Sequence, residues 1–438
     1  MSSKEEKIFS SLNGGKVNLD GADLLRAILM TRAAKEKYHG TSATSEVREF
    51  RIRMGMELDL MNLWFGKTAD YFRQFISDQT IGMARINRFD FTTLPINLLY
   101  LLYYEYRRNE KESLNFSFFE YGKNSNGNPD DDRWEMYLEL QEMYAILQRW
   151  YNDKELYHYL GFLFFNFKAQ TPFRDIYTQW KTLNSRDKFL KDIQHTIATR
   201  MLDRYLEETE KAAPDYQKCL KTMTEAISDF RENWYNNDKE LYQILILLDI
   251  FRILDSKSIK KLPTDYFTRK SGQKDGEDKE HILSQTPRKD NGEITTIKTD
   301  WEKFAQSEDF KDIRSQMQDI LNHSDAELTE QELIQLQNLL NSAGLNSIGN
   351  MALLDLRINR SYGNADYAHK RTIIFQEYMN QKYVRPHTLA VFMKGDIDTR
   401  EATGIPLNRW TLEDIKRNTD KIAKEIGKNF NAWLTQNN

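Results

Sequence analysis

Apolar residues recur at every third or fourth position through much of the chain. The pattern runs from Val47 to about Leu254 and is clearest within residues 54–76 and 134–150. Because side chains three and four positions apart share one face of an α-helix, this spacing predicts helices almost throughout the segment. Residues 31–255 are therefore expected to form an all-helical bundle domain.

A weak internal repeat lies within this helical segment. Residues 150–157 read Trp-Tyr-Asn-Asp-Lys-Glu-Leu-Tyr, and the same order returns at 234–242 with one inserted asparagine. In each copy we expect one helix to end at the Trp-Tyr pair and the Asn/Asp turn to cap the next helix. The packing of two related helical hairpins explains such a repeat, so it predicts no function.

The pattern changes at Ser256, where a stretch rich in Lys, Gly and Asp begins, and we place a domain boundary there. Beyond it the sequence predicts a short strand that ends near His281, a second strand over 349–355 and a helix over 360–378. The expected fold is mainly α, a helical bundle followed by a small domain of two strands and a helix, 256–375.

Two further helical parts belong to this expectation. Residues 300–345, between the predicted strands, form a helical insertion that is either a lid or partner-docking element or a flap without a catalytic role. Residues 376–438 form a C-terminal helical extension.

The composition supports a folded, helical protein. The 438 residues include 19 glycines and 8 prolines, and 40% of the chain is hydrophobic. The single cysteine, Cys219, excludes an intramolecular disulfide and a cysteine-ligated zinc site. The most apolar run, 94–104, is too short to cross a bilayer, and no apolar leader precedes it. We therefore expect a cytoplasmic location and no membrane anchoring.

The formal net charge of −4 argues against a protein that coats nucleic acid by bulk electrostatics. It allows a local basic cleft, because basic residues gather near both predicted strands. Those before the first strand lie within 257–274, and those after the second are Lys370, Arg371, Lys382, Arg385 and Lys394. The alternative interpretation of such a charge run is a solvated face.

The candidate chemistry lies at the predicted strands. A carboxylate and a histidine are adjacent at Glu280 and His281, and two asparagines stand nine residues apart at Asn350 and Asn359. Together they could supply a base, a loop clamp and oxygen ligands for a hard cation, as a phosphodiester-cleaving site requires. Strand alternation should point the first two side chains to opposite faces, unless a bend at 284–287 redirects one of them.

The order of these residues resembles that of a known family. Glu-His-Ile-Leu-x-Gln, then Gly-Asn, then Asn and Lys-Arg is similar to the HNH nuclease domain of GmrSD-like type IV restriction enzymes. The resemblance covers residues 275–375 and continues more weakly through Trp410. Ser284 stands where the family has proline, which should loosen the bend after the histidine without removing a ligand.

The start of the chain adds to the resemblance. Phe9, Asn13, Leu19 and Asp23 are spaced like the closing segment of the family's ParB-like N-terminal domain, so residues 1–30 are expected to be its remnant. The helical middle is similar to the family's connector. An Asp-Gly-Gln-Gln-Arg motif is absent from the sequence. We therefore expect a separate ParB-like nucleotide-binding subunit or a missing N-terminal domain as partner.

This reading gives each residue a hypothetical role. Glu280 and Asn359 would ligate one Mg²⁺ or Mn²⁺, and His281, with a pKa near neutrality, would act as general base. Asn350 would bridge the strand to the loop that carries the base. Lys370 or Arg371 would contact a phosphate. The expected function is a DNA endonuclease of restriction and phage defence, acting on double-stranded DNA, modified DNA included.

Two alternatives stay open. The chain could be a partner-dependent helical scaffold or regulatory subunit whose nuclease site is silent alone. It could also be an RNA nuclease or a ribosome-directed toxin, because the site chemistry does not distinguish the sugars, although the sequence lacks aromatic-rich RNA-binding motifs. The presence of all four residues, Glu280, His281, Asn350 and Asn359, favours the enzyme.

Overall fold

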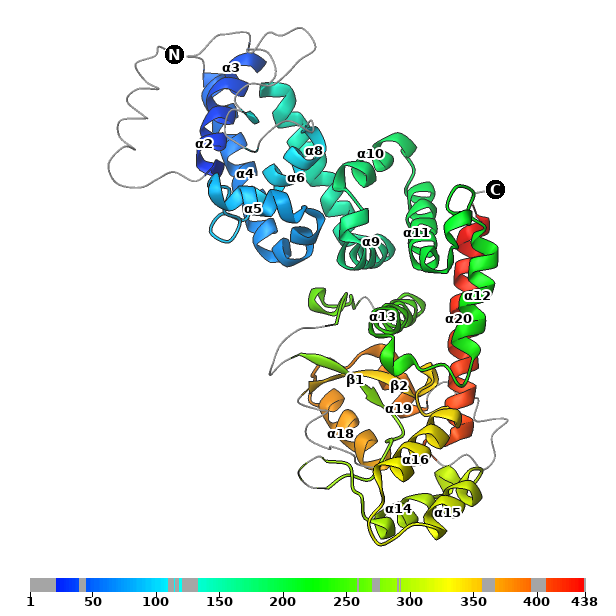
Figure 1. The fold of residues 1–438 in the computed structure, drawn as a ribbon. Coiled ribbons are helices and arrows are strands. Elements are labelled where there is room, and N and C mark those ends of the chain that lie inside the picture. Colours follow the sequence, from blue (N-terminus) through cyan, green and yellow to red (C-terminus); the bar gives the residue numbers. More distant parts are fainter. Residues whose placement is uncertain are drawn as a thin grey trace. The chain divides into compact units, whose positions relative to one another are not determined.

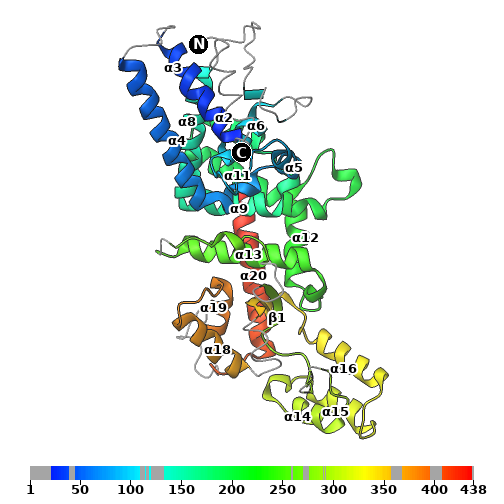
Figure 2. The ribbon, with the colours of Figure 1, turned by 90° about the vertical axis from the view of Figure 1, so that its left-hand side faces the viewer.

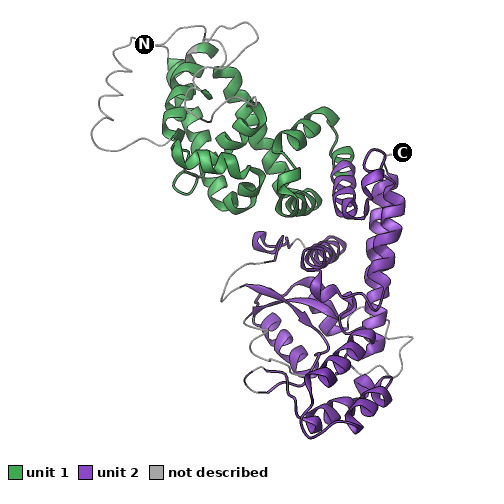
Figure 3. Ribbon diagram, in the orientation of Figure 1, with its two compact units in different colours: residues 1–190 green, residues 191–438 purple. Residues whose placement is uncertain are grey.

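The computed structural model describes residues 21–38, 45–108, 114, 118–119, 133–257, 260–269, 276–289, 291, 293–356, 367–394 and 407–436. These residues are mainly helical and contain one small sheet of two strands, as the sequence predicts. The chain divides into two compact units, residues 1–190 and 191–438 (Figure 3). The domain limits that we place from the sequence remain predictions.

The described part of unit 1 is built from helices (Figure 1). In chain order they are α2 (Gly21–Ile28), the π-helical η1 (Leu29–Ala33), α3 (Ala34–Lys37), α4 (Ser45–Phe72), η2 (Arg73–Phe75), α5 (Asp78–Ile86), α6 (Asn97–Arg107), α8 (Arg133–Asn152), α9 (Lys154–Asn166), η3 (Lys168–Gln170) and α10 (Phe173–Leu183). Helix α11 (Arg186–Leu202) begins in unit 1 and ends in unit 2. The two clearest periodic segments correspond to α4 and α8.

The core of unit 1 is rich in aromatic rings contributed by α4, α8 and α9. Trp64 of α4 packs edge-on against Tyr144 of α8, with ring centroids 5.3 Å apart. Tyr71 stacks on Tyr157 of α9 at 4.6 Å and donates its hydroxyl to the Tyr157 carbonyl at 2.8 Å. Such contacts add directional preference to the burial of apolar area, so they fix how the three helices meet.

The two copies of the repeat fold differently. In the first, α8 ends at Asn152, and the Asp153 carboxylate accepts the backbone N–H groups of Glu155 and Leu156 at the start of α9, as predicted. In the second, α12 already ends at Ser228, so the predicted helix end at the Trp-Tyr pair is wrong. The reason is a tertiary contact: the backbone N–H of Trp234 donates to the Asn346 carbonyl at 3.0 Å and the indole is buried.

Unit 2 holds the two strands and the helices around them. Its elements after α11 are η4 (Asp203–Tyr205), η5 (Glu208–Glu210), α12 (Tyr216–Ser228), η6 (Trp234–Asn236), α13 (Asp238–Asp255), η7 (Thr264–Tyr266), β1 (Glu277–His281), α14 (Lys298–Ala305), η8 (Glu308–Phe310), α15 (Arg314–Asn322), α16 (Glu330–Ser342), η9 (Ile348–Asn350), β2 (Met351–Asp355), α18 (Tyr367–Met379), α19 (Pro386–Met393) and α20 (Leu412–Thr435).

Strands β1 and β2 pair antiparallel, with Glu277 opposite Asp355 and His281 opposite Met351. The second strand begins two residues later than predicted, because residues 348–350 form a 3₁₀ turn. Helix α18 follows in chain order, and residues 360–366 of the predicted helix lie outside the described residues. Helices α12 and α20 run side by side (Figure 1).

The insertion shares one hydrophobic core with the strands. Trp301 of α14, Met317 of α15 and Leu336 of α16 belong to the same buried cluster as Leu354 of β2 and Ile374 of α18. The insertion helices are therefore an integral part of unit 2. Within the ranges that the structure describes, no helix is long and apolar enough to cross a membrane.

Gly349 lets the C-terminal helix pack directly on the turn before β2. A Cβ atom at this position would lie 2.3 Å from the Ile415 carbonyl oxygen and 2.3 Å from the Thr419 hydroxyl. The Asn418 amide of the same helix donates to the Gly349 carbonyl at 2.9 Å. Because a backbone oxygen cannot swing away, any side chain here must displace α20.

We expect Gly349→Ala to lower the free energy of unfolding by roughly 1–3 kcal/mol, the usual cost of overpacking. Gly82→Ala in α5 is the matched control, because its added Cβ would meet no atom within 4 Å. In that helix interior the change should be neutral or stabilising by about 0.5–1 kcal/mol. Urea unfolding of both variants measures the difference, and equal stabilities would contradict the packing argument.

Candidate active site

The C-terminal end of β1 presents Glu280 and His281 side by side in sequence, paired across the sheet with Ala352 and Met351. Their side chains meet different partners. Glu280 contacts Lys370 of α18, whereas His281 contacts Asn346 and Tyr235. The different sets of partners agree with the alternation of side chains along a strand.

Lys370 fastens α18 to the end of β1. Its ammonium donates to Glu280 Oε1 at 2.8 Å and to the His281 carbonyl at 2.7 Å, and the side chain is fully buried. Burial lowers the pKa of Lys370, and the charge of Glu280 works in the opposite direction. The ammonium therefore serves an internal ion pair, and its role at a DNA phosphate remains a prediction.

His281 is buried, with 7% of its surface exposed, and is held on two sides. Its Nε2 lies 2.9 Å from Asn346 Oδ1, and the Tyr235 ring stacks on it with centroids 4.6 Å apart. The Asn346 amide is fixed in turn, since it donates to Asn341 Oδ1 at 2.6 Å and accepts from Gln285 Nε2. An oxygen acceptor at Nε2 favours the tautomer that carries its proton there and leaves the Nδ1 lone pair as the acceptor.

The environment makes His281 a neutral imidazole. Burial lowers its pKa to about 4, against the effect of the Asn346 hydrogen bond, and the charges of Lys370, Lys279 and Arg288 lower it further. The predicted pKa near neutrality is therefore wrong for this conformation, because the sequence does not reveal the burial. At pH 7 the ring is unprotonated and can accept a proton.

This shift predicts that acid destabilises the fold. Unfolded His281 takes up a proton near pH 6.5 and the folded chain only near pH 4, so stability should fall as the pH drops through this window. At about 1.4 kcal/mol for each pH unit, the loss approaches about 3 kcal/mol. Urea unfolding between pH 7 and pH 4 measures it, with His281→Asn as control. An identical pH dependence in both proteins would contradict the prediction.

Asn350 ties the start of β2 to the segment that follows His281. Its Oδ1 accepts the Leu283 N–H at 2.8 Å, and its Nδ2 donates to the carbonyls of Leu283 and Leu345 at 3.1 and 2.9 Å. The side chain is completely buried. The contact lies where the sequence predicts a bridge, and the catalytic effect of Asn350 remains a prediction.

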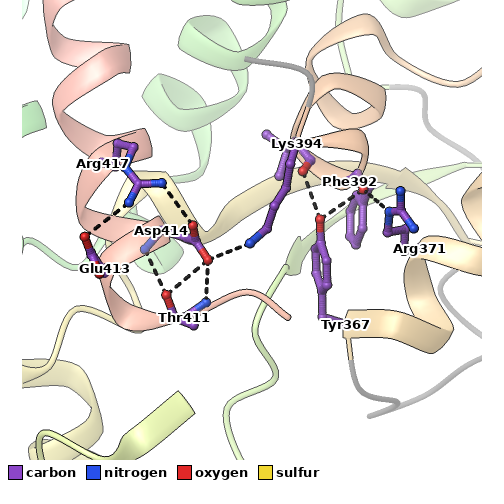
Figure 4. A network of polar contacts seen from close by, with 9 residues as sticks. Tyr367, Arg371, Phe392, Lys394, Thr411, Glu413, Asp414 and Arg417 are labelled. Atoms are coloured by element: carbon purple, nitrogen blue, oxygen red, sulfur yellow. Dashed lines mark hydrogen bonds and ion pairs between the residues drawn. The ribbon is translucent and has the colours of Figure 1, made fainter. Parts of the chain in front are cut away.

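The other two predicted site residues are Arg371 and Asn359. Arg371 is half-buried and donates from Nε to the Phe392 carbonyl at 2.9 Å (Figure 4). It also lines a hollow of about 490 Å³ with Phe375 and Met379 of the same helix. Asn359 lies outside the described residues, so its predicted role as a metal ligand remains a prediction.

Three of the basic residues near α18 are internal. Besides Lys370, Arg385 donates to Glu277 and Asp249, and Lys394 donates to Asp414 at 2.8 Å (Figure 4). All three cations are at most 4% exposed. Neither a basic cleft nor a solvated face describes these three, because each compensates a carboxylate from another element inside the fold.

Across the described ranges of the chain, no group of three or more His, Cys, Asp and Glu side chains is placed to hold a metal ion. Magnesium commonly needs fewer than three protein ligands, because one or two carboxylates bind it and water and substrate phosphates complete its coordination shell. Glu280, half-buried at the strand end, is compatible with this mode of binding.

Two residues that touch His281 are not among those predicted from the sequence. Asn346 lies four positions before Asn350, and nothing in its local pattern marks it as a partner of a histidine 65 residues away. Tyr235 belongs to the second copy of the repeat, which we attribute to packing alone. The departure of that copy from the first is the signal that could have found it, because the inserted asparagine changes the local geometry.

Comparison with known proteins bears on the C-terminal part. Residues 224–425 match the family model described as GmrSD restriction endonucleases, C-terminal domain. The match supports a GmrSD-like C-terminal part and suggests a restriction-type nuclease. It spans β1, β2 and α18 with every predicted site residue. No curated protein and no solved structure matches the chain.

Proposed function

From this match and the geometry at β1, we propose that the chain is a metal-dependent DNA endonuclease of a restriction system with an HNH-type site. The observation that carries the proposal is the neutral, oriented His281 beside Glu280 within the matched segment. Glu280 and Asn359 would hold a magnesium or manganese ion. When bound, the ion would polarise the scissile phosphate and stabilise the departing oxygen.

His281 would act as general base. The Nε2–H of His281 donates a hydrogen bond to Asn346 Oδ1, which leaves Nδ1 to accept a proton from the attacking water. Tyr235 covers one face of the ring and Asn350 fixes the segment after it, so the imidazole does not rotate freely. Lys370 donates to both the Glu280 carboxylate and the His281 carbonyl, which fixes the position of Glu280 relative to His281.

The partner-dependent alternative also has an observation in its favour. With 7% of His281 exposed, the base is closed to solvent in this conformation. Water and a phosphodiester reach it only after the surrounding segments move. A ParB-like nucleotide-binding subunit or domain is the partner that we propose for this opening, and Arg371 is the residue that we propose for a flanking phosphate.

Cleavage of supercoiled plasmid tests the proposal. We expect nicking with Mg²⁺ or Mn²⁺, none with EDTA, and faster nicking when a ParB-like subunit and nucleotide are added. A labelled RNA of matched length, run in parallel, separates a DNA endonuclease from a ribonuclease. EDTA-resistant nicking would contradict the metal-dependent mechanism, and an uncut plasmid with metal, partner and nucleotide together would refute the nuclease.

A further inference from the structure

Helix α4 carries an exposed apolar stripe as well as a buried one. Met54, Leu58, Met61 and Phe65 face the core of unit 1 and are at most 3% exposed. The stripe, on another face, consists of Ile52, Met56, Leu60 and Leu63, each between 61% and 64% exposed. Single exposed apolar residues are ordinary, whereas four in a row along about 16 Å of helix mark an interaction surface.

Charged residues border this stripe in a regular way. Glu49 and Lys67 lie 18 positions apart (67 minus 49), which is five turns of an α-helix, so they project from one line along the helix. Arg48 and Asp70 lie toward the other side of the stripe, and all four residues are exposed. The acidic Glu49 precedes the basic Lys67 along the chain, whereas the basic Arg48 precedes the acidic Asp70.

The arrangement is nearly symmetric about residue 58, from which Arg48 and Asp70 lie ten and twelve positions away. Met56 and Leu60 lie two positions from it, Glu49 and Lys67 lie nine positions from it, and Ile52 and Leu63 are nearly equidistant. A two-fold axis through this point would turn the helix onto an antiparallel copy of itself. Figure 2 shows α4 along an outer edge of unit 1.

We propose that α4 is a homodimer interface, in which the stripe packs antiparallel on the stripe of a second copy of this chain. Glu49 then meets Lys67 of the second copy, and Arg48 meets Asp70 of the second copy, each pair occurring twice. The central Met56 and Leu60 bury each other across the axis, and the flanking charges select the antiparallel orientation, as in coiled coils.

Charge complementarity argues for a second copy as the occupant. A parallel pairing would set Glu49 against Glu49, whereas the antiparallel pairing matches opposite charges on both sides of the stripe. Asp59, near the axis, is already compensated by Arg26 of its own chain. Glu49 forms an ion pair with Arg53 at 3.5 Å, and both side chains are exposed. Such a pair is weak, so it does not prevent Glu49 from pairing with a residue of the second copy.

Sedimentation equilibrium of the full chain tests the interface. We expect a monomer–dimer equilibrium, and Leu60→Glu should raise the dissociation constant by about tenfold or more, because it buries like charges beside the axis. Ile86→Glu is the matched control, since Ile86 of α5 is 81% exposed and lies outside the stripe. This variant should dimerise like the wild type.

A charge swap identifies the partner. Glu49→Lys and Lys67→Glu should each weaken the dimer, and the double variant should restore it, because the swapped charges again face each other. The Glu49–Arg53 contact cannot explain restoration, since it is lost in the double variant too. A monomer at every concentration, a dimer insensitive to Leu60→Glu, or no restoration by the swap would each overturn the proposal, independently of nuclease activity.

Discussion

His281→Ala is expected to lower plasmid cleavage by about 10²–10⁴-fold, the range that general-base catalysis contributes. The side chain stands at the end of β1 with Nε2 engaged by Asn346 and its pKa lowered to about 4, so the neutral ring is available at pH 7. His195→Ala in α11 is the control and should keep full activity. Initial nicking rates in Mg²⁺ measure both variants.

Removing a buried ring beside Tyr235 also removes packing, so the loss of activity must be separated from a loss of structure. His281→Asn retains a polar side chain of moderate size and should lose activity to a similar degree, while its far-ultraviolet circular dichroism stays that of the wild type. Equal cleavage by the wild type and a folded His281→Ala variant would remove His281 from the mechanism.

Arg385→Leu is expected to lower the free energy of unfolding by about 3–5 kcal/mol. The guanidinium donates twice to Glu277 of β1, at 2.7 Å each, and to Asp249 of α13 at 2.8 Å. Burial raises the pKa of Asp249 even with Arg385 beside it. Without the arginine, two buried carboxylates would be left with less compensation than their desolvation requires.

Arg417→Ala is the matched control for this prediction. Arg417 pairs with Glu413 at 3.2 Å and with Asp414 at 3.3 Å. Its own side chain is 41% exposed and Asp414 keeps the ammonium of Lys394, so solvent screening and this second cation limit the loss. Its loss should cost no more than about 1 kcal/mol. Adding Glu277→Gln to Arg385→Leu should recover part of the stability. Urea unfolding compares the variants, and equal losses for Arg385→Leu and Arg417→Ala would contradict the argument.

Local sequence was sufficient for most of the helices. The periodic segments 54–76 and 134–150 became α4 and α8, and the Asp153 cap stands where the turn chemistry places it. The order of Glu280, His281, Asn350 and Lys370 was enough to suggest a site, and the structure brings these four residues together around the end of β1. The helices and the cap depend on neighbours a few positions away, which a sequence displays directly.

Contacts between residues that are distant in the chain could not be predicted from the local sequence pattern. His281 finds Asn346 65 residues later, Lys370 reaches Glu280 90 residues earlier, and Arg385 reaches Asp249 136 residues earlier. A lysine or arginine reads the same in sequence whether it faces water or a buried carboxylate. Only the folded chain therefore shows that the side chains of Lys370, Arg385 and Lys394 face buried carboxylates and not water.

The sequence by itself determined the helical class, the order of the two strands and α18, and the residue types available for chemistry. Only the tertiary structure decided that His281 is buried and neutral and that it contacts Asn346 and Tyr235. The same is true of the close packing of α20 on Gly349. The physical reason is that helix formation responds to spacing along the chain, whereas burial and charge compensation depend on which distant segments pack together.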